Sequence, residues 1–191
     1  MRIITGKNKG QKIIAPKGKD FTRPALSKVR EAIFSSLGDV TGLTFMDVFA
    51  GCGSLGFEAL SRGAASCAFI ENHPKAIQSL IINIKNLGLG AQARIYKRTL
   101  PFGLKDIKNH EPLDVIFCDP PYDNHLINKT LRALIKYNFI SDDTLIIVEH
   151  TKREMPLVEN LKTIKEKKFG QTLITYLKRF EPDDQQVTSE P

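Results

Sequence analysis

The chain has 191 residues, of which 41% are hydrophobic, and a formal net charge of +7. These values are typical of a soluble globular protein with one domain, or one domain and a small extension. No apolar run is long enough to span a membrane and the first residues lack a secretory signal, so we expect a cytoplasmic protein. The three cysteines and four histidines show no metal-ligand spacing, which predicts reduced thiols and no metal.

Basic side chains gather near both ends of the chain. Residues 1–30 contain nine Lys or Arg and one acid, and a second basic group lies between residues 162 and 179. Such clusters are typical of proteins that bind nucleic acid, although on charge alone a solvated basic surface is the alternative. The candidate RNA-binding residues are Arg2, Lys7, Lys9, Lys12, Arg23, Lys167 and Lys168.

The first forty residues differ in pattern from the rest. Residues 2–5 and 11–15 predict two short strands around a lysine-rich, glycine-bounded turn, that is, a basic β-hairpin. Apolar residues at helical spacing then predict a helix from Pro24 to Gly38. We assign 1–40 as an RNA-binding extension.

From residue 44 the sequence alternates between strand and helix patterns. Strands are predicted over 44–49, 66–71, 92–97, 114–118 and 144–149, and helices over 54–62, 74–87, 100–109 and 124–137. Repeated units of this kind indicate a parallel, doubly wound sheet with a Rossmann-like α/β fold. Residues 161–168 and 171–180 add an antiparallel hairpin at one edge, which gives seven strands in a domain over 41–180. Residues 181–191 are acidic and predicted to be disordered.

The first strand of the sheet runs into a glycine-rich turn. Gly51, Gly53 and Gly56 fit the spacing G-x-G-x-x-G, which lets backbone approach a ligand closely. Asp47 within the strand would repel a pyrophosphate and attract an ammonium or sulfonium group. Glu71 ends the second strand, where an acid accepts hydrogen bonds from ribose hydroxyls. A ribose with no phosphate to bind suggests S-adenosylmethionine (AdoMet) rather than NAD.

The fourth strand ends in Asp119-Pro120-Pro121-Tyr122. The prolines end the strand, so these residues stand at the carboxyl edge of the sheet, where open α/β sheets bind ligands. A carboxylate, a fixed carbonyl and an aromatic ring make a receptor for a planar amine. Taken alone, the motif is also compatible with a simple turn.

Together these segments resemble a known family. Residues 47–63, Glu71-Asn72 and Asp119-Pro-Pro-Tyr122 look like a Rossmann-like, AdoMet-dependent amino-methyltransferase. The starting segment Arg2-Ile-Ile-Thr-Gly, Thr22-Arg-Pro before a helix, and Phe169-Gly-Gln-Thr narrow the resemblance to the RsmD family of 16S ribosomal RNA guanine-N2 methyltransferases. It covers about residues 1–180.

The resemblance implies roles for the motif residues. Asp119, with the Pro120 carbonyl and Pro121, would orient the target amine, and Tyr122 would stack on the extruded base. It also implies a 16S rRNA substrate in a small-subunit particle. No feature of the sequence requires more than one copy of the chain, so we expect a monomer. The implied cofactor contacts are Asp47, Phe49, Ala50, Gly51, Gly53, Ser54, Gly56, Glu71, Asn72 and Thr99.

One segment departs from the family pattern, because Lys97-Arg98-Thr99-Leu100 stands where the family places an acid near the adenine. We expect the Thr99 hydroxyl to take the place of this acid beside the adenine of the cofactor. Two alternatives remain open from the sequence. One is a DNA adenine-N6 or cytosine-N4 methyltransferase, and the other is a non-catalytic nucleic-acid-binding protein with this fold.

Overall fold

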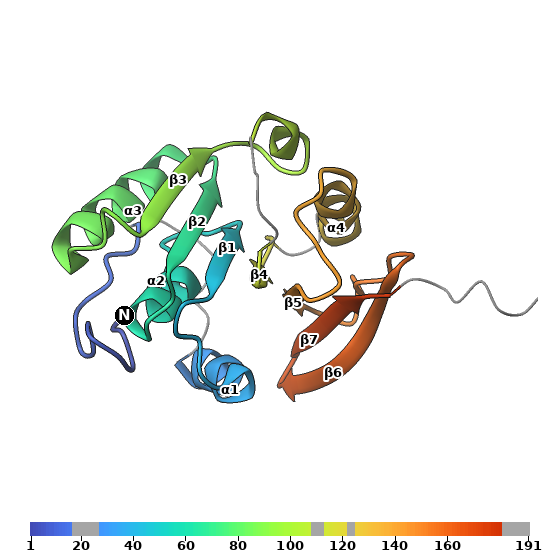
Figure 1. Cartoon of the computed structure of the whole chain (residues 1–191), viewed down its shortest axis with the longest axis horizontal. Coiled ribbons are helices and arrows are strands. Elements are labelled where there is room, and N and C mark those ends of the chain that lie inside the picture. Colours follow the sequence, from blue (N-terminus) through green and yellow to red (C-terminus); the bar gives the residue numbers. More distant parts are fainter. Residues whose placement is uncertain (17–26, 108–112, 122–124, 181–191) are drawn as a thin grey trace, which may run out of the picture.

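The computed structural model describes residues 1–16, 27–107, 113–121 and 125–180 (Figure 1). A seven-stranded sheet has the order β3-β2-β1-β4-β5-β7-β6. The strands are β1 Thr44–Val48, β2 Ser66–Glu71, β3 Ala93–Lys97, β4 Val115–Cys118, β5 Leu145–His150, β6 Leu161–Phe169 and β7 Thr172–Arg179. The helices are α1 Ser27–Leu37, α2 Ser54–Ser61, α3 Pro74–Leu87 and α4 Ile127–Lys136, and η1 Phe102–Asp106 is a 3₁₀ helix.

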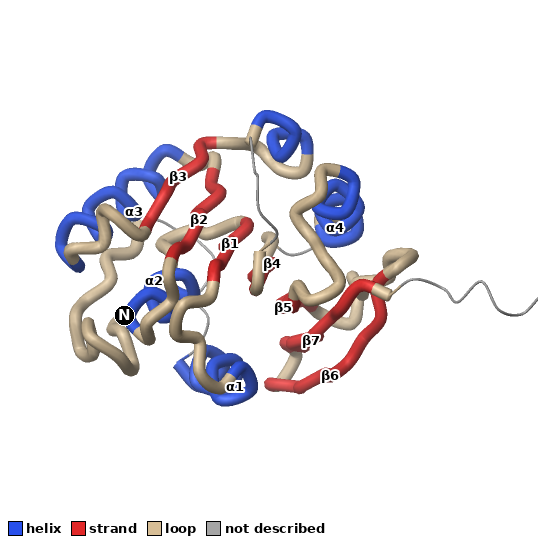
Figure 2. The backbone as a smooth tube through the Cα atoms, in the orientation of Figure 1, coloured by secondary structure: helices blue, strands red, loops and turns tan. Residues whose placement is uncertain are grey.

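Strands β1 to β5 pair in parallel, and β7 pairs antiparallel with β5 and with β6 (Figure 2). The Rossmann-like α/β fold and the C-terminal antiparallel hairpin are therefore confirmed. The strand order reverses between β1 and β4, which creates a crevice at their carboxyl ends.

Helices cover both faces of the sheet, as a parallel sheet requires. Apolar residues of α1, α2 and α3 form one core cluster with one face of the strands, and residues of η1 and α4 form a second cluster with the other face. All four residues of β4 are buried, because this central strand has neighbours on every side. The local signals of α3 are clear: His73 caps its first turn, Pro74 is its first residue, and Gly88 ends it with a φ of 67°.

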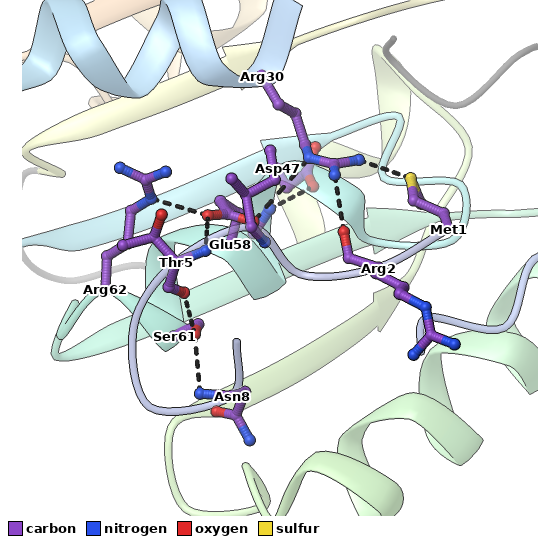
Figure 3. A network of polar contacts seen from close by, with 11 residues as sticks. Met1, Arg2, Thr5, Asn8, Arg30, Asp47, Glu58, Ser61 and Arg62 are labelled. Atoms are coloured by element: carbon purple, nitrogen blue, oxygen red, sulfur yellow. Dashed lines mark hydrogen bonds and ion pairs between the residues drawn. The ribbon is translucent and has the colours of Figure 1, made fainter. Parts of the chain in front are cut away.

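The predicted N-terminal β-hairpin is wrong. Within residues 1–16 a single antiparallel bridge joins Arg2 to Lys12, and no strand forms. The backbone amides of Ile4 and Thr5 donate instead to the Glu58 carboxylate in α2, at 2.8 and 3.0 Å (Figure 3). Backbone bonds between the two arms stop at Ile3, whose amide donates to the Gln11 carbonyl at 3.0 Å, and the ladder does not continue because Glu58 accepts from the next two amides.

The N-terminal residues also share the core of the sheet. Ile3 and Ile13 are buried in the same cluster as Phe45 of β1 and Phe117 of β4. The boundary at residue 40 stays a prediction, and the tail from residue 181 lies outside the described residues. Among the helices that the structure describes, none is long and apolar enough to cross a membrane.

Candidate active site

The strand register brings the predicted site residues to one edge of the sheet. Val48 of β1 lies opposite Ile70 of β2 and Cys118 of β4, and Glu71 lies opposite Lys97 of β3. The segments that follow these residues therefore leave the sheet side by side.

A cavity of about 410 Å³ lies at this edge. Its size is within the range of small-molecule sites. Its lining residues are Phe49, Gly51, Ile70, Glu71, Asn72, His73, Ala76, Arg98, Thr99, Leu100, Asp119, Pro121 and Leu126. Seven of the predicted site residues thus meet in one hollow, namely Phe49, Gly51, Glu71, Asn72, Thr99, Asp119 and Pro121.

The three glycines of the turn have different structural roles. Gly51 has a φ of 56° and open space where a side chain would stand, so it gives the cavity a bare backbone surface. A Cβ on Gly53, which has a φ of 79°, would lie 2.7 Å from a methyl group of Leu80 in α3. A Cβ on Gly56 would lie 2.3 Å from the Phe69 ring of β2. The last two glycines therefore permit close packing and, like Ala50 and Ser54, are not among the described lining residues.

Phe49 begins this turn in a conformation that is rare for a bulky residue. Its φ is 64°, in the left-handed region. Such backbone strain clusters at functional sites, and Phe49 lines the cavity.

Glu71 both holds the turn and faces the cavity. One oxygen, Oε2, accepts from the Gly51 amide at 2.8 Å, and Oε1 accepts from the amides of Asn72 and His73, each at 2.8 Å. A carboxylate has about four lone-pair positions. One position on Oε2 therefore remains to accept a hydroxyl from a ligand, where the sequence suggested that both ribose hydroxyls would bind.

The Asp47 carboxyl lies beneath the turn rather than in the cavity. It is 3% exposed and accepts a hydrogen bond from the Gly56 amide at 3.2 Å, in the first turn of α2. Burial, with a smaller contribution from the Glu71 charge, raises the pKa of Asp47 to about 8. Its expected attraction for a ligand cation stays a prediction; the contact that the structure shows is support of α2.

Asp119 follows the last residue of β4 and is half-buried in the cavity wall. Removal from water raises its pKa well above the ordinary value, and the nearby carboxylates of Glu149 and Asp47 raise it further. Such a perturbed carboxyl in a cleft is typical of a catalytic group. Pro120 is buried and lines a second, small hollow with Glu149 and Glu154. Tyr122 lies outside the described residues.

The sequence did not single out several lining residues, such as Ile70, His73, Ala76 and Leu126. Ile70 and His73 adjoin Glu71-Asn72 in the sequence, whereas Ala76 and Leu126 lie several residues from any predicted site residue. Arg98 also faces the cavity, with its Nε 3.9 Å from the Asp106 carboxylate. The Thr99 hydroxyl accepts from the Asn72 amide at 3.4 Å, which joins the ends of β2 and β3.

The predicted RNA-binding residues do not form one group. The Lys7 amide donates to the Ser61 carbonyl and its Nζ to Gln92 at 2.8 Å, which places the lysine-rich turn at the amino edge of the sheet, opposite the cavity. Lys168 lies at the carboxyl edge, beside the end of β5.

The other basic candidates differ in exposure and in contacts. Lys9 and Lys12 are exposed. Arg2 donates to the Gly10 carbonyl, and Lys167 donates to the Ala32 carbonyl of α1. Arg23 lies outside the described residues.

The cysteines are free and buried. Burial raises the pKa of the Cys52 thiol to about 11, so this residue of the turn is protonated at neutral pH and is not a nucleophile. Among the described residues, no group of three His, Cys, Asp or Glu side chains could hold a metal ion. The absence of a metal stays a prediction.

The cavity residues fit AdoMet. Glu71 has a free acceptor position for a ribose hydroxyl, and Ile70, Ala76 and Leu100 provide apolar walls for a flat base. The carboxylates of Glu71 and Asp119 favour a cationic ligand over a pyrophosphate.

The fold is that of solved methyltransferases. The structure of yhhF from Escherichia coli, described as a "Putative methyltransferase", has a TM-score of 0.81 and 33% identity, and the match covers 94% of this chain and 97% of that chain. A ribosomal protein L11 methylase from Lactobacillus delbrueckii has a TM-score of 0.65 at 15% identity, with 84% and 81% covered, and shows the fold alone. The protein is therefore a Rossmann-like methyltransferase, and this fold implies AdoMet as its cofactor.

Within that class the family is also defined. The family model described as "Conserved hypothetical protein 95" matches residues 1–178. The chain is 35% identical to YlbH of Bacillus subtilis, over 94% of this chain and 99% of the relative. It is 35% identical to the ribosomal RNA small subunit methyltransferase D of Buchnera aphidicola, over 92% and 91% of the two chains. The chain belongs to this RsmD/YlbH family.

Proposed function

We propose that this protein transfers the methyl group of AdoMet to the exocyclic N2 amine of a guanine in 16S ribosomal RNA. The observation that carries the proposal is Asp119 in the wall of a cavity at the point where the strand order reverses. We take ribosomal RNA as the substrate from the names of the RsmD relatives, which are small-subunit ribosomal RNA methyltransferases. The guanine N2 target rests on the resemblance of the motifs.

The chemistry suits an amine of low reactivity. The lone pair of an exocyclic amine is delocalised into the base, so the amine must be oriented before it can attack a methyl group. When bound, AdoMet supplies that methyl group on a positively charged sulfur. Glu71, Asn72 and Thr99 would hold the cofactor beside the bare backbone of Gly51.

Asp119 acts on the amine. Its ionised carboxylate accepts a hydrogen bond from the NH2 group and favours a more tetrahedral nitrogen, an effect of positioning and electrostatics. As the new nitrogen–carbon bond forms, the nitrogen gains positive charge and must lose a proton. A carboxylate whose pKa is raised by burial and by Glu149 is well suited to take that proton.

Binding of a base into the cavity requires that the base leaves its stack. Tyr122 is our proposed stacking partner for the extruded base, and the exposed Lys9, Lys12 and Lys168 are proposed contacts of the RNA backbone. A monomer in the cytoplasm, acting on a partly assembled subunit, is part of the same proposal.

The test is transfer of labelled methyl from AdoMet. Unmodified small-subunit RNA, unmodified small subunits and DNA are offered in parallel, and the modified nucleoside is identified by mass. We expect N2-methylguanosine from RNA or subunits. N6-methyladenine or N4-methylcytosine in DNA would replace the proposed substrate, and cofactor binding without transfer would favour a binding protein.

A pair of variants links the activity to the site. Asp119→Ala should abolish transfer and leave AdoMet affinity nearly unchanged. Asp142→Ala is the matched control, because Asp142 is an exposed acid that does not line the cavity and pairs with Arg179 at 3.8 Å. Equal loss of transfer and of AdoMet binding in Asp119→Ala would show that this residue holds the cofactor instead.

A further inference from the structure

Asn83 is a polar residue within the apolar stripe of α3. Ala76, Leu80 and Leu87 are buried against the sheet, and Asn83 occupies the next position of the same stripe with no exposed surface. A buried amide costs free energy unless its hydrogen bonds are made. An apolar residue could fill this position without that cost in free energy, so the contacts of the amide have to explain its presence.

The Asn83 amide joins two segments that are far apart in the sequence. Its Oδ1 accepts from the Ile14 amide at 2.8 Å, and its Nδ2 donates to the Ile14 carbonyl at 2.9 Å. The same Nδ2 donates to the Cys52 carbonyl, in the glycine turn, at 3.3 Å. Both donor hydrogens of the side chain and one lone-pair position of its oxygen are therefore used.

Residues 1–14 form what we call the N-terminal strap. At its start, Glu58 of α2 accepts from the Ile4 and Thr5 amides (Figure 3). Ser61, the last residue of α2, accepts from the Asn8 amide at 3.0 Å and donates to the Thr5 carbonyl at 2.6 Å (Figure 3). The strap thus runs from the end of α2 to the glycine turn, and Asn83 is its contact with that turn.

The glycine turn is held between two side chains. Glu71 accepts from the Gly51 amide on the cavity side, and Asn83 donates to the next residue, Cys52, on the side of the strap. Gly53, after Cys52, packs on Leu80 of α3. The position of the Gly51 backbone in the cavity wall is thereby tied to α3 and to the strap.

We propose that Asn83 is a positioning residue for cofactor binding, which fixes the glycine turn by joining it to the N-terminal strap. The inference rests on the proposed AdoMet site, and it gives the strap a part in forming that site. In this arrangement the hydrogen bonds of Asn83 are made before the ligand arrives, so that the turn needs no ordering when it binds.

The experiment compares two side chains that hold the strap at its two ends. Asn83→Leu removes the bonds to Ile14 and to Cys52, and Asn83→Ser is a smaller change of the same kind. Ser61→Ala removes two hydrogen bonds to the strap but lies at the opposite end of α2 from the turn. AdoMet affinity is measured by titration calorimetry well below the melting temperature of each variant, and exchange of the Gly53 amide, which donates to the Ala50 carbonyl, is followed by NMR.

We expect both Asn83 variants to raise the AdoMet Kd about tenfold, the effect of one to two lost hydrogen bonds. Gly53 amide exchange should be faster in the same variants. Ser61→Ala should lower the melting temperature while its Kd stays within about twofold of the wild type. An equal Kd change in Ser61→Ala and Asn83→Ser, or an unchanged Kd in the Asn83 variants, would overturn the inference. A wild-type protein that fails to bind AdoMet would overturn the proposed function itself.

Discussion

Replacement of Asp47 by Asn should make the free energy of unfolding less dependent on pH. The Asp47 carboxyl is buried, and its pKa is raised from 3.8 to about 8 in the folded protein. Between these values the folded state keeps a proton that the unfolded state has lost. The free energy of unfolding therefore falls as pH rises through this window, and the loss is complete above about pH 8. Asn has no such proton, and its side-chain oxygen can still accept from Gly56.

The size of the effect follows from the one proton involved. A difference of one bound proton changes the free energy of unfolding by about 1.4 kcal/mol per pH unit. Between pH 5 and pH 7 the wild type should therefore lose about 3 kcal/mol relative to Asp47→Asn. Any fixed cost of the substitution appears at every pH and does not alter this slope.

The assay is urea unfolding of both proteins at pH 5, 6 and 7. Over this pH range the folded Asp47 is uncharged, as Asn is, so the other groups titrate alike in the two folded proteins and the difference between the two free energies isolates Asp47. The exposed Asp142→Asn serves as the control for an Asp-to-Asn change at the surface. A constant difference between wild type and Asp47→Asn would mean that Asp47 is ionised in the folded protein, and the argument from burial would fail.

Three further predictions concern catalysis, packing and RNA. Because the pKa of Asp119 is raised and its ionised form accepts from the amine, kcat/KM for RNA should rise with pH through that pKa, and Asp119→Asn should remove the rise along with most of the activity. Stopped assays across the pH range in which the protein stays folded measure both, and a profile unchanged by the substitution would contradict the assignment. Gly56→Ala should destabilise by about 1–3 kcal/mol in urea unfolding, since its Cβ would lie 2.3 Å from Phe69; a stability gain, as helix propensity alone predicts, would refute the packing argument. Lys168→Ala should make the salt dependence of RNA binding less steep by about 0.7–0.9 in log–log slope, measured by filter binding. Lys9→Ala, at the other edge of the sheet, tests the second proposed contact in the same way, and an unchanged slope there would remove the N-terminal turn from the path of the RNA.

Some parts of the structure could be read from local sequence. The bounds of β2 and α3 agree with the prediction residue by residue, because Pro74 and Gly88 mark the ends of α3 and Glu71 ends an apolar run. The edge hairpin was also predicted, since Gly170 provides the left-handed turn between β6 and β7. The helix predicted over 100–109 is only the short η1 within the described residues.

Other parts depend on contacts between distant residues, which no local pattern reveals. The N-terminal strands were predicted as two short segments around a glycine-bounded turn, but Glu58 and Ser61 accept hydrogen bonds from amides of that segment. Glu71 was expected to serve a ligand, and the structure shows that it also binds the Gly51 amide. The double role of Asn83 is of the same kind. In each case the deciding partner lies more than 15 residues away.

The charge of the cavity makes one more prediction, which concerns the ligand. Glu71 and Asp119 line the cavity and Asp47 lies beneath its floor, so the site is rich in carboxyl groups, two of which have raised pKa values. A positive charge within a few ångströms lowers the pKa of a carboxyl group. AdoMet carries a sulfonium charge that its product S-adenosylhomocysteine lacks, whereas the amino acid groups of the two ligands are alike. Binding of AdoMet should therefore release protons that binding of the product does not.

Titration calorimetry in buffers of different ionisation enthalpy measures this release. We expect the ratio of AdoMet affinity to S-adenosylhomocysteine affinity to increase between pH 6 and pH 8, and the increase to shrink in Asp47→Asn, because the pKa of Asp47 is about 8. The sign follows because AdoMet binds best to the ionised carboxyls, whose population grows with pH. An affinity ratio that stays constant over this range would show that the sulfonium lies outside the field of these groups. The methyl donor would then have to approach Asp119 from another direction, and the proposed arrangement of amine and methyl group at this edge of the sheet would be wrong.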